Sequence, residues 1–263
     1  MDLKLADKIV LITGASRGLG YATAHQFLME GAQTIINSRS EDNLIKAQQS
    51  LFEKTNRKPI IFSGDMVDRS FAEMISNFIE NRFGKLDILI TNSGGPPPGN
   101  FESLSEKQWD QAIELSFLSH MRLIKACLPL LRKSESPSVV TITSYSTKQP
   151  ILNLILSNSI RMATIGMTKT LALEYGSENI RFNSILPGWT ETERVENLLI
   201  DRAQKNGTSP EIEKQKQEKE IALLRLAKPE EFAKVTVFLA SPAASYMTGL
   251  MISVDGGALK GTY

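Results

Sequence analysis

The segment TGASRGLG, residues 13–20, has the residue types and the position of a phosphate-binding turn. It follows an apolar run directly and leads into a helix-length segment. In that setting Gly14 allows a tight turn, Gly18 lets a pyrophosphate approach the backbone, and Gly20 lets the helix pack closely on a sheet. The free N–H groups at the helix N-terminus favour phosphate. The segment therefore predicts a dinucleotide-binding site.

The residues at the end of the next apolar run bear on which dinucleotide is bound. They are Asn37, Ser38 and Arg39, with no carboxylate to accept a hydrogen bond from a ribose 2′-hydroxyl. Arg39, together with Arg17 in the glycine turn, could instead neutralise a 2′-phosphate. Either arginine alone could be an ordinary surface charge, but the two together favour NADP(H) over NAD(H).

Elements of two kinds alternate along the chain and would position this turn. Helix-length amphipathic segments separate short runs that are nearly continuous in apolar residues, as parallel strands covered on both faces are. The runs lie at residues 8–13, 32–37, 58–63, 86–91, 138–143, 180–186 and 251–254. This alternation predicts an α/β fold with a doubly wound, Rossmann-type, seven-stranded parallel sheet in a single domain.

Local signals place several helix ends. Ser40 is expected to cap a helix that begins with acidic residues, and Gly31 and Gly176 stand where helices should stop. Pro229 suits the first turn of a later helix. The polar stretch 201–220 fits a solvated helix, a mobile loop, or a lid over a substrate site. We favour a substrate-lid segment at about residues 190–225.

Composition and charge exclude several function classes. The 263 residues carry a net charge of +1, so no overall field attracts nucleic acid or an acidic membrane. A single cysteine, Cys127, forms no disulfide framework, and His25 and His120 lack the neighbours of a metal site. No secretory signal or membrane-spanning run is visible, so we expect a soluble, cytoplasmic protein.

Taken together, the motifs resemble the classical short-chain dehydrogenase/reductase family, closest to its 3-oxoacyl-carrier-protein reductase-like branch. The glycine turn is joined by GDMVD at 64–68, NSGG at 92–95, LPGWTET at 186–192 and VDGG at 254–257. The resemblance implies a homodimer or homotetramer, a small-molecule substrate, and cofactor contacts from Gly14, Ser16, Arg17, Gly18, Leu19, Gly20, Ser38, Arg39, Asp65, Met66, Asn92, Ser93, Gly94, Pro187, Gly188, Thr190 and Thr192.

The resemblance also implies a catalytic serine, tyrosine, lysine and asparagine. The family moves hydride between nicotinamide and a carbonyl or alcohol, while the tyrosine exchanges the proton. Ser144 matches the serine, but Ser157, Arg161 and Ser116 stand where the tyrosine, lysine and asparagine are expected. A serine hydroxyl is a far weaker acid than a phenol, and losing a general acid typically slows a reaction by ~10²–10⁴-fold.

A second tyrosine and lysine follow Ser144 in sequence. Tyr145 and Lys148 could both reach the nicotinamide if the chain turns directly after Ser144, since adjacent strand residues point to opposite faces. The favoured alternative packs Tyr145 beneath a helix and leaves Lys148 in solvent.

Two functions stay open at this point. The cofactor motifs favour a divergent NADP(H)-dependent oxidoreductase that acts on a carbonyl or hydroxyl compound. The replaced tyrosine and lysine favour a catalytically inactive dinucleotide-binding sensor or scaffold. We favour the enzyme, because Ser144 and a shaped Pro187–Gly188 loop have little purpose in a pure binder.

Overall fold

Parallel strands form one sheet, in the order β3-β2-β1-β4-β5-β6-β7, in the computed structural model, which describes residues 1–262. All seven predicted strands are present, most of them shorter than the apolar runs by one or two residues at an end. Their bounds are β1 (Ile9–Ile12), β2 (Gln33–Ser38), β3 (Ile60–Ser63), β4 (Ile88–Thr91), β5 (Ser138–Ile142), β6 (Arg181–Pro187) and β7 (Met251–Val254). The predicted α/β Rossmann-type fold is confirmed.

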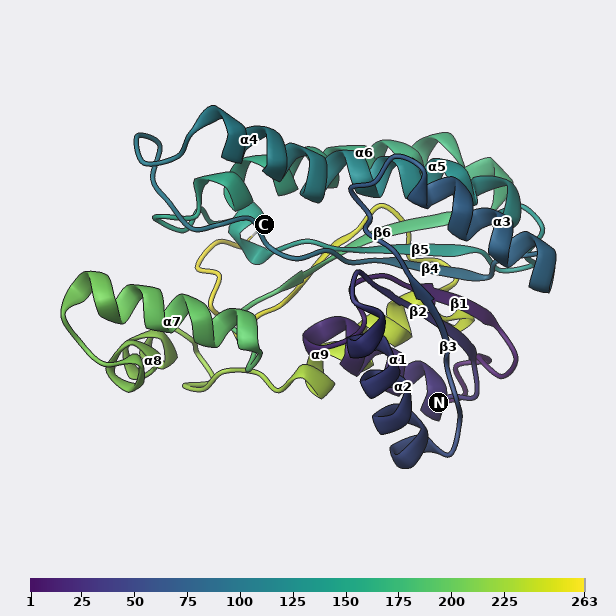
Figure 1. The fold of residues 1–263 in the computed structure, drawn as a ribbon, viewed down its shortest axis with the longest axis horizontal. Helices are drawn as coiled ribbons and strands as arrows, with labels where there is room; N and C mark the ends of the chain where they lie inside the picture. The colour runs from purple at the N-terminus through teal and green to yellow at the C-terminus, as the bar shows by residue number, and fades with distance from the viewer. Residues whose placement is uncertain (263) are drawn as a thin grey trace.

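Helices cover both faces of this sheet (Figure 1). One layer holds α1 (Gly18–Met29), α2 (Glu41–Thr55) and α9 (Pro229–Ala240). The other holds α3 (Phe71–Phe83), α4 (Glu106–Ile113), α5 (Ser119–Leu131) and α6 (Ile155–Glu174). Chain order reverses between β1 and β4, so the loops after these two strands diverge and leave a crevice at their carboxyl ends.

The two helical layers divide the apolar residues of each strand between them. Val10 and Ile12 of β1 pack toward α1 and α9, whereas Leu11 packs toward α3 and α5. This division follows from the alternation of side chains along a strand. It explains why the strands read as continuous apolar runs.

The predicted helix ends agree with the structure. The Ser40 hydroxyl accepts a hydrogen bond of 3.3 Å from the backbone N–H of Asn43 and so caps α2. Gly31 follows α1 with a φ of 86° that favours glycine, and Gly176 begins a short 3₁₀ turn after α6. Pro229 is the first residue of α9.

The polar stretch 201–220 is helical. It belongs to a hairpin of α7 (Glu193–Asn206) and α8 (Pro210–Lys219), whose N-termini are capped by the hydroxyls of Thr192 and Ser209. Gly207 ends α7 in the left-handed conformation. The hairpin extends beyond the carboxyl end of β6 (Figure 1). Within residues 1–262, no helix has the length and apolar character to cross a membrane.

Candidate active site

Two adjacent cavities lie at the carboxyl ends of the strands. The first, here called the nucleotide cleft, has a volume of about 580 Å³ and runs from the glycine turn past Ser144 to Thr192. The second, here called the lid cavity, has a volume of about 530 Å³ and lies beneath α7 and α8. Four residues line both cavities: Tyr145, Ile151, Leu154 and Leu198. The volumes are typical of small-molecule sites.

The glycine turn is fastened to the end of β4. The side-chain amide of Asn92 donates to the Gly14 carbonyl at 3.1 Å, and the Thr13 hydroxyl donates to the Asn92 carbonyl at 2.7 Å. A Cβ on Gly14 would lie 2.9 Å from the Asn92 amide nitrogen, so no larger residue fits. These contacts hold the turn so that the N-terminus of α1, at Gly18, faces the cleft.

Gly20 differs from the other predicted cofactor contacts, because it does not line the cleft. A Cβ there would run into the backbone of Gly14 and Ala15, so this glycine permits close packing of α1 on the turn. The remaining predicted cofactor contacts do line the cleft: Gly14, Ser16, Arg17, Gly18, Leu19, Ser38, Arg39, Asp65, Met66, Asn92, Ser93, Gly94, Pro187, Gly188, Thr190 and Thr192.

The two arginines expected at a 2′-phosphate each have a carboxylate nearby. Arg39 lies 3.8 Å from Asp65, and Arg17 lies 2.5 Å from Glu193 at the start of α7. Both arginine side chains are exposed, at 77% and 67%. Exposed pairs of this kind are worth little, so either guanidinium can turn toward a phosphate at small cost.

At the other end of the cleft, α6 presents Ser157 and Arg161 toward the end of β5. The Arg161 guanidinium donates through Nη1 to the carbonyls of Ile142, at 3.2 Å, and Thr143, at 2.9 Å. The Ser157 hydroxyl lies 3.4 Å from that of Ser146, while the Ser144 hydroxyl accepts from the Ser146 backbone N–H at 3.1 Å. The structure thus brings Ser144, Ser157 and Arg161 together, as the sequence predicts.

Arg161 is a buried cation without an ion pair in the described part of the chain. Burial, and then the charge of Arg194, lowers its pKa to about 10, so it stays protonated at neutral pH. Burying an uncompensated charge is costly. This end of the cleft therefore favours electron-rich or anionic groups on a ligand.

His120 lies behind this cation. Its Nε2 is 3.0 Å from the Ser93 hydroxyl, and burial followed by the charge of Arg161 lowers its pKa to about 3. The imidazole is therefore neutral at neutral pH. Residues 1–262 contain no cluster of metal-binding side chains around it or elsewhere.

Ser116 and Lys148 lie away from the cleft, contrary to their inclusion among the predicted catalytic residues. Ser116 is buried in a π-helical turn, Glu114–Leu118, and its carbonyl accepts from the Thr164 hydroxyl at 2.6 Å. Lys148 is exposed beyond a short 3₁₀ turn, Tyr145–Thr147. Neither residue lines either cavity.

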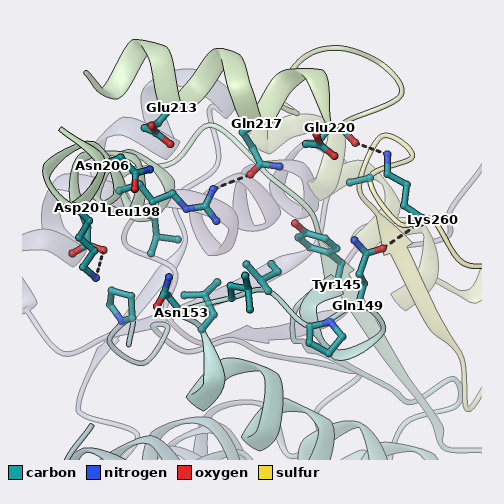
Figure 2. A pocket seen from close by; sticks show the side chains of 18 residues that line it. Tyr145, Gln149, Asn153, Leu198, Asp201, Asn206, Glu213, Gln217, Glu220 and Lys260 are labelled. Atoms are coloured by element: carbon teal, nitrogen blue, oxygen red, sulfur yellow. Dashed lines mark hydrogen bonds and ion pairs between the residues drawn. The ribbon is translucent and has the colours of Figure 1, made fainter. Parts of the chain in front are cut away.

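Tyr145, by contrast, faces both cavities, because that 3₁₀ turn begins directly after Ser144. Its hydroxyl accepts a hydrogen bond of 2.6 Å from the indole Nε1 of Trp189. Burial raises the Tyr145 pKa, against the Trp189 hydrogen bond and the charge of Arg202. Figure 2 shows the ring at the wall of the lid cavity. Tyr145 is therefore buried, as expected, and it also lines both cavities.

The chain matches the model of the enoyl-(acyl carrier protein) reductase family over residues 14–258. It belongs to the classical short-chain dehydrogenase/reductase family. Two curated members of this family are similar to the chain over nearly its whole length. The NADPH-dependent reductase BacG of Bacillus subtilis is 30% identical, over 97% of this chain and 99% of its own. The 3-oxoacyl-[acyl-carrier-protein] reductase FabG of Thermotoga maritima is 31% identical, over 97% and 99%.

Solved structures of other members superpose closely. L-sorbose reductase from Gluconobacter frateurii, complexed with NADPH and L-sorbose, gives a TM-score of 0.93 at 30% identity and covers 99% of this chain and 100% of its own. The chain thus belongs to an enzyme family of nicotinamide-dependent oxidoreductases that act on small molecules.

Several residues of this short-chain dehydrogenase/reductase line the cleft without having been predicted. Trp189 and Arg194 are the most prominent, and Arg194 donates through Nη2 to the Pro96 carbonyl at 2.6 Å. A Cβ on Gly95 would lie 2.8 Å from that Nη2, so the guanidinium lies directly over the loop after β4. The sequence could have predicted both residues, because they follow β6, and the carboxyl end of β6 lies at the same edge of the sheet as the glycine turn.

Proposed function

We propose that this protein is an NADP(H)-dependent oxidoreductase that acts on a carbonyl or hydroxyl compound through an atypical active site. The observation that carries the proposal is that Tyr145 lines both the nucleotide cleft and the lid cavity, so that a substrate-sized space adjoins the cleft in which a cofactor would bind. When bound, the nicotinamide cofactor supplies or accepts the hydride.

The residues of the cleft fit that cofactor. The fixed turn at Gly14 and the free N-terminus of α1 suit a pyrophosphate. Arg161 would bind the nicotinamide ribose or the reacting oxygen, and Arg17 and Arg39 would bind a 2′-phosphate. Two relatives favour the phosphorylated cofactor: BacG is an NADPH-dependent reductase, and L-sorbose reductase was solved in complex with NADPH.

We assign the proton donor to Tyr145. Its hydroxyl accepts from Trp189 and so keeps its own hydrogen available for a substrate oxygen. The nearby Arg202 guanidinium would stabilise the phenolate that forms, since an adjacent cation favours the charged form of a phenol. Ser144 would position the substrate oxygen, and Lys148 takes no part.

A catalytically inactive, dinucleotide-binding sensor or scaffold is the second candidate. Ser157 favours it, because no phenol occupies this position between Ser144 and Arg161. Both candidates require the nucleotide cleft, and they differ in turnover alone.

The deciding experiment measures NADPH binding by fluorescence and then turnover on a panel of ketones, aldehydes and oxo acids. Binding with turnover is expected, and binding without any turnover would favour the sensor. Tyr145→Phe should slow a detected activity by ~10²–10⁴-fold while NADPH affinity stays unchanged. An undiminished rate in this variant would remove Tyr145 from the mechanism.

A gain-of-function variant tests the rest of the pocket. Ser157→Tyr combined with Arg161→Lys should introduce or accelerate ordinary ketone reduction, because both side chains would enter the cleft beside Ser144. Arg161→Lys alone is the control and should not do so.

Assembly and compartment are part of the same proposal. We place the protein in the cytoplasm as a homodimer or homotetramer that associates through α4, α5 and α6, which lie in one helical layer (Figure 1).

A further inference from the structure

Arg202, on α7, lines the lid cavity and contacts two uncharged side chains. Its Nη1 donates to the side-chain oxygen of Gln217 on α8 at 3.0 Å. The guanidinium carbon lies 4.5 Å from the centre of the Trp189 ring. Both partners are neutral. They hold the planar group in one orientation without neutralising it.

Three of the other five charged side chains around this cavity, those of Asp201, Lys205 and Glu213, form ion pairs. Lys205 pairs with Asp201 at 2.9 Å, Glu213 pairs with Lys216 at 2.7 Å, and the Lys260 ammonium donates to the Glu220 carbonyl at 2.9 Å. Figure 2 shows the Lys260 contact at the far rim of the cavity. Arg202 forms no ion pair within residues 1–262, so its remaining donors are available to a ligand.

The surroundings of Arg202 indicate the charge of that ligand. Burial lowers the Arg202 pKa, and the charges of Tyr145, Glu213 and Asp201 oppose that shift. Asp201 and Glu213 are themselves paired with lysines, so Arg202 contributes a single uncompensated positive charge, which a singly charged carboxylate matches better than a doubly charged phosphate. A fixed guanidinium fork also matches the planar geometry of a carboxylate.

Arg202 lies close to Tyr145, the proposed proton donor. Tyr145 lines both cavities, and the charge of Arg202 acts on its hydroxyl. A molecule that binds Arg202 with one end would therefore have its other end beside Tyr145, the residue that the lid cavity shares with the nucleotide cleft. The polar side chains around the cavity, among them Gln149, Asn153 and Asn206, suit a compact polar molecule better than a long acyl chain (Figure 2).

We propose that Arg202 and Gln217 form a carboxylate-binding subsite, and that the substrate is a small oxo- or hydroxycarboxylic acid whose reacting carbon lies in the nucleotide cleft. This inference rests on the proposed oxidoreductase function. The carboxylate contacts the free edge of the Arg202 guanidinium, and Gln217 keeps that guanidinium in place.

The test measures equilibrium binding, so that it does not depend on turnover. The probes are 2-oxopentanoate, 4-oxopentanoate and 5-oxohexanoate, each compared with its methyl ester, by calorimetry with and without saturating NADP⁺. At least one acid should bind about 10- to 100-fold more tightly than its ester, the range expected for a hydrogen bond to a charged group. If none binds better than its ester, the proposal is overturned.

Two variants locate the effect. Arg202→Gln should bring the ester-to-acid ratio of dissociation constants close to one. Gln217→Glu should do the same, because it places a carboxylate of the protein beside the guanidinium. Circular dichroism and NADP⁺ affinity show that each variant is folded. A ratio that stays high in Arg202→Gln would contradict the assignment.

Lys260→Gln is the control of matched charge, since it removes another cation from the cavity wall, and the ratio should persist. An equal fall in Arg202→Gln and Lys260→Gln would show a diffuse charge effect and would also overturn the subsite. Failure of the oxidoreductase function is recognised separately, by carboxylate binding without any cofactor binding or hydride transfer.

Discussion

His120 lies fully buried behind Arg161, with its pKa lowered from 6.5 to about 3. Between these two values the unfolded chain binds a proton that the folded protein excludes, so the free energy of unfolding decreases as the pH falls. For one such group the loss between pH 7.5 and 5.5 is roughly 1.4 kcal/mol. Over this pH range, we expect the free energy of unfolding of His120→Gln to decrease by about 1.4 kcal/mol less than that of the wild type. Urea unfolding at the two pH values measures this difference.

The second histidine provides the control. His25 is partly buried, and burial is the main cause that lowers its pKa. Its contribution to the free energy of unfolding therefore also decreases as the pH falls. Lys54 lowers this pKa further, while Glu230 opposes the shift. His25→Gln should change the pH dependence less than His120→Gln does. Equal pH dependence in wild type and His120→Gln would show that the imidazole is not held neutral in the folded state.

The proposed preference for NADPH can be tested at a single residue. Arg39 is largely exposed and lies 3.8 Å from Asp65, so it is free to meet a 2′-phosphate. We expect Arg39→Gln to weaken NADPH binding about tenfold, the lower end for a hydrogen bond to a charged group, and to leave NADH binding nearly unchanged. Fluorescence titration of both cofactors measures this. Arg69→Gln, an exposed arginine outside the cleft, is the control, and parallel losses for both cofactors would contradict the assignment.

At the scale of elements, α7 is fastened to the loop after β4 by Arg194. Its hydrogen bond of 2.6 Å to the Pro96 carbonyl joins segments that are far apart in sequence. Loss of a charged hydrogen bond of ~1.5–3 kcal/mol should make local opening about tenfold more frequent or more. We therefore expect Arg194→Gln to accelerate amide hydrogen exchange across Glu193–Asn206.

The matched control lies on the same helix. Lys205 pairs with Asp201 beside the lid cavity, but both side chains are largely exposed to solvent, and such pairs contribute little. Lys205→Gln should leave the exchange rates of α7 unchanged. If Arg194→Gln also leaves them unchanged, α7 is held by its apolar contacts alone.

The same elements show what local sequence signals can and cannot give. The strands and the glycine turn were predictable, because apolar runs and required glycines are local features. The positions of Ser116 and Lys148 were not. The π-helical turn shifts the helix face at Ser116, and the 3₁₀ turn after Ser144 directs Tyr145 inward and Lys148 outward. The sequence also did not predict that Arg202 lines a cavity. Which face of α7 does so depends on how the polar hairpin folds back, and the pattern of apolar residues does not indicate this.

At the scale of the whole molecule, the outer face of α4 to α6 carries exposed apolar side chains. Ile113 is 37% exposed and Met162 is 47% exposed, whereas the neighbouring Ile165 belongs to the core. In a two-fold assembly through this face, each Met162 would meet the partner's equivalent surface. We expect Met162→Glu to place like charges across the interface and to convert the assembly to a 29.1 kDa monomer, as measured by light scattering.

Thermal unfolding gives an independent readout of the same assembly. The Tm of the wild type should rise with protein concentration, because association stabilises the folded chain, and that dependence should disappear in Met162→Glu. Met29→Glu is the control. Met29 is 58% exposed on α1, in the opposite helical layer, so this change should alter neither mass nor concentration dependence. A monomeric wild type, or equal effects of the two substitutions, would exclude an interface on this face.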